Sequence, residues 1–480
     1  MGIKLIKLTE QQEDCVKFKA EGELLIRGIP GAGKTTVVLE RAIFLQKQAR
    51  ALNSSKVVLL TYNKALSIYL QQIARASSDE AVDALTFHTW GSQLLRQNGL
   101  LTRRMIKKGE GINIVLHAKR TVSKYGDPDF PKVNTKGMNE ERALATFLME
   151  EISWIKNNNI KDRQNYLSTQ RNGRGKQVFI NKSHRETIYD TFEKYQQLLR
   201  NRYYCIDFDD VAVLLLDNYN KIPSGDLPDH ILIDEAQDLS PLQFMVIKKL
   251  TQKSITIAAD KGQQIYRRTF TWKSVGIEIR GGRSKLLSKS FRSTKQIIQL
   301  ARSLQKHDKT LINDDEFLPT EDPEAEGPKP ELIITQNNKD EIQSVVRKIR
   351  QIKGTFHTDT IAIIAYSHNR LIEFEEELKE FNIVPIHIKS EEADLLTPGV
   401  KLVSFQSSKG LEFDHVIVTG LKEGILPHSR MEPGDDPDAY EATERRKLYV
   451  AMTRAKLTLT LSAVRPISPF VRELDSDLYQ

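Results

Sequence analysis

The sequence predicts an α/β protein built on two parallel sheets, with a helical unit inserted in the first half. Short apolar runs typical of strands recur near both ends of the chain, and helix-like stretches follow them, an alternation that indicates parallel sheets. Residues 94–203, between these two regions, are helix-rich and polar. At 480 residues the chain is too long for one compact core, so roughly two to four domains are expected.

The predicted strands fall into two groups, one for each sheet. The first group comprises residues 23–27, 56–61, 231–233 and 254–259, and the second comprises residues 360–366, 400–405, 414–420 and 457–463. We therefore assign residues 1–93 and 204–283 to the first α/β domain, 94–203 to the helical insertion and 284–480 to the second α/β domain. Residues 313–329 are acidic and carry three prolines, which indicates a surface loop or linker.

The composition narrows the class of protein. There are 71 Lys and Arg residues against 63 Asp and Glu, a formal net charge of +8, which suits a polyanionic partner but is equally compatible with solubility alone. The two cysteines, Cys15 and Cys205, cannot form an iron–sulfur or zinc site from thiolates alone, and they suit a reducing cytosol. The N-terminus has no apolar signal core, and no apolar run approaches the ~20 residues that span a membrane. We therefore expect a soluble, cytoplasmic protein with no membrane association.

A glycine-rich segment lies between the first predicted strand and a helix-like stretch. It reads Gly28-Ile29-Pro30-Gly31-Ala32-Gly33-Lys34-Thr35 and fits G-x-x-x-x-G-K-[ST] with the flanking elements that this phosphate-binding motif requires. Its glycines let backbone N–H groups approach phosphate oxygens, and the helix N-terminus adds a favourable dipole. Lys34 would neutralise the β- and γ-phosphates, and the Thr35 hydroxyl would bind Mg²⁺. The sequence therefore predicts a nucleoside triphosphate site.

Two acids, Asp234 and Glu235, follow the predicted strand 231–233 in the stretch HILIDEAQDLSPLQF. Burying a carboxylate without a partner is costly, so these acids need either a cation or solvent. The alternative interpretation is therefore that the strand simply leaves the core here and the two acids lie in an acidic turn. A metal nuclease would need a second acidic cluster with metal-ligand spacing, which the sequence lacks. A phosphate-loop enzyme needs one acid for Mg²⁺ and another to orient the attacking water. We predict these roles for Asp234 and Glu235, respectively.

The phosphate loop together with ILIDEAQD resembles the superfamily 1 DNA helicases of the UvrD/Rep/PcrA type. Eight further motifs occur in the family's order along almost the whole chain. They are LTEQQ (8–12), TYNK (61–64), TFH (86–88), FDD (208–210), AADKGQQIYRR (258–268), SFRST (290–294), SFQSSKGLEF (404–413) and ERRKLYVAMTRA (444–455). The resemblance implies two RecA-like domains of the P-loop NTPase fold, with ATP and Mg²⁺ bound between them.

The resemblance also implies roles for individual residues. The expected catalytic residues are Lys34, Asp234, Glu235, Gln263, Arg292 and Arg454, with Thr35 and Asp234 on the metal. Gln12, Phe291 and Glu412 would contact the adenine and ribose, and Thr36 would join Gly28–Thr35 in binding the nucleotide. The expected nucleic-acid contacts are Tyr62, Asn63, Phe87, His88, Tyr266, Arg268, Trp272 and Gln406, because stacking aromatics and basic side chains bind single strands. The two arginines could instead be surface charges, and each aromatic could instead pack in the core.

Three features depart from the family pattern. Thr36 stands where the family often has an arginine near the adenine, and Gln406 replaces the usual histidine. Only about a dozen residues separate IVPIHIK from VKLVSF, so a large domain that the family carries there is absent. The sequence also stops soon after the last motif, which leaves no room for a nuclease domain or partner-binding tail.

We therefore expect an ATP-dependent translocase and helicase that moves 3′ to 5′ on single-stranded DNA and unwinds tailed duplexes, as the resemblance implies. It would act in the cytoplasm, in association with the nucleoid. The alternative is a motor subunit that unwinds weakly by itself and serves a partner nuclease or a repair or phage-defence protein. A protein that binds nucleic acid and uses ATP only structurally is a third possibility.

Overall fold

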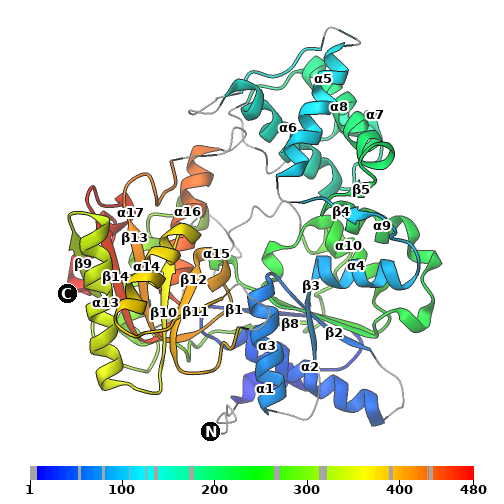
Figure 1. Ribbon diagram of the computed structural model, residues 1–480. Helices are drawn as coiled ribbons and strands as arrows, with labels where there is room; N and C mark the ends of the chain where they lie inside the picture. The colour runs from blue at the N-terminus through cyan, green and yellow to red at the C-terminus, as the bar shows by residue number, and fades with distance from the viewer. Residues whose placement is uncertain are drawn as a thin grey trace.

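The computed structural model describes residues 8–51, 56–77, 82–107, 109–124, 126, 128–133, 139–171, 174, 178–263, 271–312, 322–388, 393–429, 431 and 436–480. These residues form two six-stranded parallel sheets and a separate group of helices, drawn at the top of Figure 1. The predicted α/β class is therefore confirmed. None of the described helices combines the length and apolar character needed to cross a bilayer.

The first sheet has the strand order β3-β2-β6-β7-β1-β8. Its strands are β1 (Gly22–Gly28), β2 (Val57–Thr61), β3 (Asp83–Thr86), β6 (His230–Ile233), β7 (Ser254–Ala259) and β8 (Ser284–Leu287). Strand β8 pairs in parallel with β1, from Leu25 opposite Ser284 to Gly28 opposite Leu287. The first sheet thus extends four residues past the predicted boundary at residue 283, because the run SKLL at 284–287 is too short to identify as a strand from sequence.

Helices cover both faces of the first sheet. The helices α2 (Lys34–Ala51) and α3 (Lys64–Ser77) pack with Leu24, Ile26 and Leu59 on one face. The opposite face is covered by α4 (Phe87–Gln97), α9 (Asp210–Asn218) and α10 (Pro241–Leu250), and α1 (Glu10–Val16) lies beside α2. Both faces of the strands are therefore buried, which is why they are continuous apolar runs. Helix α4 belongs to this core as far as Gln97, so it overlaps the predicted start of the insertion at residue 94.

The insertion is a helical unit with its own core. It consists of α5 (Glu110–Lys124), α6 (Glu140–Asn157), α7 (Arg163–Ser168) and α8 (Lys182–Asn201). Its buried side chains include Val115, Phe147 and Tyr195. A two-stranded parallel ladder of β4 (Arg104–Met105) and β5 (Cys205–Ile206) joins the chain entering the insertion to the chain leaving it. We call this ladder and the start of α9 the neck of the insertion.

The second sheet has the strand order β11-β12-β10-β13-β14-β9. Its strands are β9 (Glu331–Thr335), β10 (Thr360–Ala365), β11 (Ile386–His387), β12 (Gly399–Ser404), β13 (Phe413–Leu421) and β14 (Ala455–Val464). Helices α11 (Lys295–Gln305) and α16 (Pro437–Met452) pack on one face, and α13 (Asn338–Thr355) and α14 (His368–Glu380) pack on the other. The short helices are α12 (Lys309–Ile312), α15 (Phe405–Ser408), α17 (Pro469–Arg472) and the 3-10 turns η1 (Tyr219–Lys221), η2 (Ser224–Asp226), η3 (Ala236–Asp238), η4 (Lys261–Gln263), η5 (Lys273–Val275) and η6 (Ser476–Leu478).

Helix α3 of the first domain packs directly against the second domain. At its N-terminus, Asn63 Nδ2 donates to the carbonyl oxygen of Lys409 at 3.3 Å. Further along, Gln72 Nε2 donates to the Ala393 carbonyl at 2.8 Å, and Gln72 Oε1 accepts from the Leu395 N–H at 3.0 Å. The short segment between β11 and β12 therefore contacts the first domain directly. These contacts fix how the two sheets face each other across the site described next.

Candidate active site between the two sheets

The glycine-rich segment forms a loop between β1 and α2, as the motif requires. Gly31 and Gly33 have φ angles of 77° and 78°, in the left-handed region that favours glycine. The Lys34 side chain folds back into the loop, where its Nζ donates to the carbonyl oxygens of Gly28 at 2.8 Å and Ile29 at 2.9 Å. It also donates to Asp260 Oδ2 at 2.9 Å, at the end of β7. The loop thus presents a buried cation in the position expected for a phosphate-binding lysine.

Asp234 lies at the carboxyl end of β6, directly beside the start of α2. Its Oδ2 accepts a hydrogen bond from Thr35 Oγ1 at 2.7 Å, so the two predicted metal ligands are adjacent. Burial, together with the neighbouring charge of Glu235, raises the pKa of Asp234 to about 6. A carboxylate with a raised pKa lacks sufficient positive charge nearby. Two oxygen ligands and an undercompensated negative charge suit Mg²⁺, which prefers oxygen donors.

Glu235 has an unusual backbone conformation for a residue with a side chain. Its φ is 55° and its ψ is 40°, a left-handed conformation that costs of order 1–3 kcal/mol and is concentrated at functional sites. Gln237 Nε2 donates to Glu235 Oε2 at 2.5 Å. Burial alone would raise the pKa of Glu235, but the charges of Lys409 and Arg454 lower it below its ordinary value. Glu235 therefore stays ionised, as a residue that accepts a proton or orients water must be.

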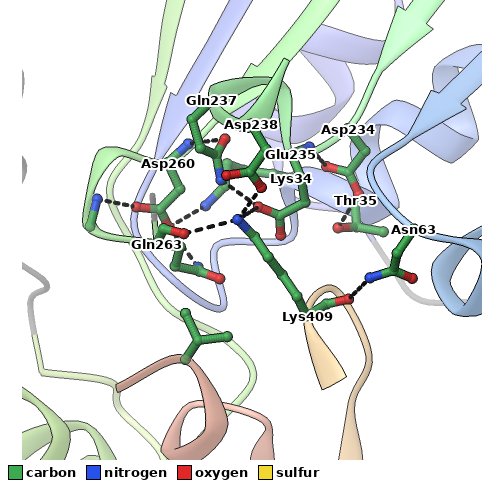
Figure 2. Close-up of polar contacts among 12 residues, drawn as sticks. Lys34, Thr35, Asn63, Asp234, Glu235, Gln237, Asp238, Asp260, Gln263 and Lys409 are labelled. Carbon is green, nitrogen blue, oxygen red and sulfur yellow. Dashed lines mark hydrogen bonds and ion pairs between the residues drawn. The ribbon is translucent and has the colours of Figure 1, made fainter. Parts of the chain in front are cut away.

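Two cations from the second domain reach the site residues of the first, and Figure 2 shows one of them, Lys409, among the acids. Lys409, fully buried, forms an ion pair with Asp238, lies 3.5 Å from Glu235 Oε2 and donates to the Gln263 carbonyl at 2.9 Å. Arg454 follows α16 and donates from Nη2 to Gln263 Oε1 at 2.7 Å. Gln263 is held from its own side as well, because its Nε2 donates to Asp260 Oδ2 at 2.7 Å. Gln263 thus connects the loop after β7 to the second domain.

The remaining predicted nucleotide contacts lie around the glycine-rich loop. Gln12 Nε2 donates to the Ala32 carbonyl at 3.0 Å, and the Phe291 N–H donates to the Gly31 carbonyl at 2.9 Å. The Phe291 ring is 56% exposed, so it is available to stack on a base. Arg292, a predicted catalytic residue, is paired in this structure with another predicted site residue, since its Nη2 lies 2.5 Å from Glu412 Oε1. Pro30 and Thr36 lie in the loop and in the first turn of α2.

The predicted nucleic-acid contacts divide into three groups. Tyr62, Asn63, His88 and Gln406 are at least partly exposed, and the Tyr62 ring lies 5.5 Å from Lys409 Nζ. Phe87 and Trp272 do not fit the prediction, because they are 2% and 5% exposed and pack in the core of the first domain. Sequence could not separate a stacking aromatic from a core aromatic at these two positions. Tyr266 and Arg268 lie outside the described residues.

Three residues of the site were missed from the sequence. Asp260 holds both Lys34 and Gln263, and the available signal was its place directly after β7. Lys409 contacts Asp238 and the Gln263 carbonyl, and the available signal was its place in the SFQSSKGLEF motif. Phe208 is 53% exposed and meets the His88 ring edge-on, with a centroid distance of 5.7 Å. The available signal in the sequence was the aromatic residue of the FDD motif, Phe208, which could have indicated a surface next to the TFH motif.

Comparisons with known proteins agree with the motif order. The UvrD/REP helicase N-terminal domain matches residues 8–271, and the UvrD-like helicase C-terminal domain matches residues 286–392 and 385–466. The ATP-dependent DNA helicase PcrA of Leuconostoc citreum is 22% identical over 78% of this chain and 49% of its own length. DNA helicase IV of Escherichia coli is 24% identical over 91% and 65%, and a probable DNA helicase of Mycoplasma pneumoniae is 24% identical over 90% and 79%. The chain spans about half the length of several relatives that it matches.

Because the two domain families cover most of the residues, and the sheets and cleft have the geometry that the motifs require, the chain belongs to the UvrD/REP helicase family.

Proposed function

We propose that the protein is an ATP-dependent motor on single-stranded DNA that moves 3′ to 5′ and unwinds tailed duplexes. The observation that carries this proposal is Gln263, which the first domain holds through Asp260 and the second domain holds through Arg454 and Lys409. A residue contacted from both sides of a cleft can transmit a change in the nucleotide to the relative position of the two domains. Hydrolysis would then be coupled to domain movement.

The chain's own residues supply the groups that hydrolysis needs. Lys34 would move from Asp260 to the phosphates, since an ammonium that already lies in the loop needs little rearrangement. Glu235, kept ionised by Lys409, would orient the attacking water and accept its proton. Arg454 and Arg292 would approach the charge that develops on the terminal phosphate. Thr35 and Asp234 would hold Mg²⁺, which when bound neutralises phosphate charge.

Several residues of the first domain support a surface that binds a single strand. Tyr62 and Asn63 directly precede α3, and the partly buried His88 in α4 meets the exposed Phe208, which lies just before α9. Gln406 at α15 comes from the second domain, and its carbonyl accepts from Asn63 Nδ2 at 3.4 Å. Base stacking on such aromatics contributes roughly 1–3 kcal/mol per base and tolerates any sequence. A surface made from both domains would change shape when the cleft closes.

The decisive experiment measures ATP hydrolysis with single-stranded DNA, duplex DNA and RNA, and unwinding of 3′- and 5′-tailed duplexes. We expect single-stranded DNA to stimulate hydrolysis and the 3′-tailed duplex to be unwound. Lys34→Ala should abolish both, whereas Lys379→Ala, on the surface of α14, should change neither. Hydrolysis that no nucleic acid stimulates would refute the proposal. Strong stimulation without unwinding would favour a motor subunit that serves a partner protein.

A further inference from the structure

The segment of residues 288–294 crosses from the first sheet to the second directly over the glycine-rich loop. At its start, β8 pairs with β1, and the Ile29 N–H donates to the Leu287 carbonyl at 3.4 Å. At its end, Ser293 Oγ donates to the Ala455 carbonyl at 2.6 Å, which ties the segment to β14. The segment is thus anchored to the loop at one end and to the second domain at the other. Its central residues are held close to the loop.

Ser290 lies at the point of closest approach. A Cβ atom built on Gly31 would lie 2.4 Å from Ser290 Oγ and 3.0 Å from Arg292 Cβ, so the hydroxyl and the backbone of Gly31 are in contact. The Phe291 N–H, one residue further, donates to the Gly31 carbonyl. The Ser290 hydroxyl therefore lies against Gly31, in the same loop whose Gly28 and Ile29 carbonyls hold Lys34 Nζ. Lysines of such loops reach the β- and γ-phosphates.

The Ser290 hydroxyl has no hydrogen-bond partner among the described residues, although Ser290 is only 6% exposed. A buried polar group without a partner is costly, so such groups are rare in folded proteins. On the same segment, Arg292 Nε is also buried without a partner in the described chain. Two unsatisfied donors that approach one phosphate-binding loop indicate a missing acceptor with several oxygens.

We propose that Ser290 is a nucleotide-binding residue whose hydroxyl donates a hydrogen bond to the terminal phosphate of the bound triphosphate. This inference rests on the proposed function and adds a contact that distinguishes a triphosphate from a diphosphate. Because the segment is tied to both sheets, the contact forms only when the crossing segment lies against the loop. Release of the terminal phosphate would leave the hydroxyl unsatisfied again and weaken the hold of the segment on the loop.

The test compares the affinities of the full chain for a non-hydrolysable ATP analogue and for ADP, both with Mg²⁺, by isothermal titration calorimetry. Ser290→Ala should weaken binding of the analogue roughly tenfold, the loss expected for one hydrogen bond to a charged group, and leave ADP binding unchanged. Since Ser290→Ala also removes a buried unsatisfied hydroxyl, the melting temperature of the nucleotide-free protein should not fall.

Thr294→Val is the matched control. Thr294 Oγ1 is also buried without a partner in the described chain, but Thr294 packs against Gly327 and not against the loop. This variant should bind both nucleotides as the wild type does. If Ser290→Ala keeps full affinity for the analogue, or loses affinity for both nucleotides equally, the inference is wrong. A wild-type chain that binds neither nucleotide would instead refute the proposed function itself.

Discussion

Two fully buried lysines, each held by two carboxylates, occupy different kinds of place in this protein. Lys156 lies at the neck of the insertion, with Asp207 Oδ2 at 2.5 Å and Asp210 Oδ1 at 2.7 Å. Lys409 lies between the two sheets, paired with Asp238 and 3.5 Å from Glu235. In both clusters burial alone would lower the lysine pKa, and the two acids raise it above its ordinary value. Both ammonium groups therefore remain charged.

The two clusters differ in how completely they are satisfied. At the neck, all four carboxylate oxygens accept hydrogen bonds, including one from Tyr195 and two from the backbone N–H groups of Asp207 and Asp210. Burial raises the pKa of one carboxyl in each place, Asp207 at the neck and Asp234 in the cleft, to about 6. Only the cleft, however, holds an acid, Glu235, in a left-handed backbone conformation. A satisfied cluster fixes one arrangement, whereas a strained one leaves free energy that a ligand can use. We therefore expect the neck cluster to be structural and the cleft cluster to be functional.

The largest expected effect is on hydrolysis, from Glu235→Gln. The amide keeps the size and the left-handed backbone but cannot accept a proton, so the hydrolysis rate should fall about 10²- to 10⁴-fold. Binding of ATP should be retained, because the phosphate loop is intact. A single-turnover measurement of ATP cleavage, alongside a binding titration, checks both. Near-normal cleavage would remove Glu235 from the catalytic role.

Lys156→Met tests whether the neck cluster is structural. The substitution leaves two buried carboxylates without their cation, and breaking such a pair costs about 3–5 kcal/mol. Chemical denaturation should show this loss of stability, with the helical insertion becoming sensitive to protease. The DNA-independent ATPase rate of the protein that remains folded should be unchanged. If the Lys156→Met variant folds fully but loses ATP turnover, the neck cluster is not purely structural and the contrast with the cleft is wrong.

Lys409→Met tests the electrostatic role of the cleft cluster. Because Lys409 lowers the pKa of Glu235, removing it should raise that pKa. The rate of hydrolysis falls when Glu235 is protonated, so the acid limb of the pH–rate profile should move to higher pH. In Lys156→Met the acid limb should stay where it is in the wild type. An unshifted profile in Lys409→Met would show that this lysine does not act through Glu235.

The smallest expected effect is a gain in stability from Asp234→Asn. The pKa of Asp234 is raised from 3.8 to about 6, so its contribution to stability is present below pH 3.8 and is lost as the pH rises through 6. The uncharged amide avoids this loss. The nucleotide-free variant should therefore be more stable than the wild type by about 1–3 kcal/mol at pH 7, with little difference near pH 4. Thermal unfolding at the two pH values gives the comparison, and lower stability at pH 7 would refute it.

The sequence by itself determined the α/β class and four strands of each sheet, and it predicted the ATP-site residues Lys34, Asp234 and Glu235. These features depend on local patterns, because a parallel strand that is buried on both faces is a continuous apolar run and a phosphate loop has fixed spacing. The family motifs predicted only some of the residues that make contacts between the two domains. Arg454 was identified, whereas Lys409 and the partner of Arg292 were not.

Only the tertiary structure decided which polar and aromatic side chains meet. Phe87 and Trp272 became core residues because α4 and α10 bury that face of the first sheet, while Phe208 remained exposed beside His88. Lys409 and Asp238 are 171 residues apart in the chain, and Lys34 and Asp260 are 226 apart. Pairings over such separations depend on strand order and domain packing, which no local pattern records. For the same reason, the unsatisfied hydroxyl of Ser290 could be found only where the crossing segment meets Gly31.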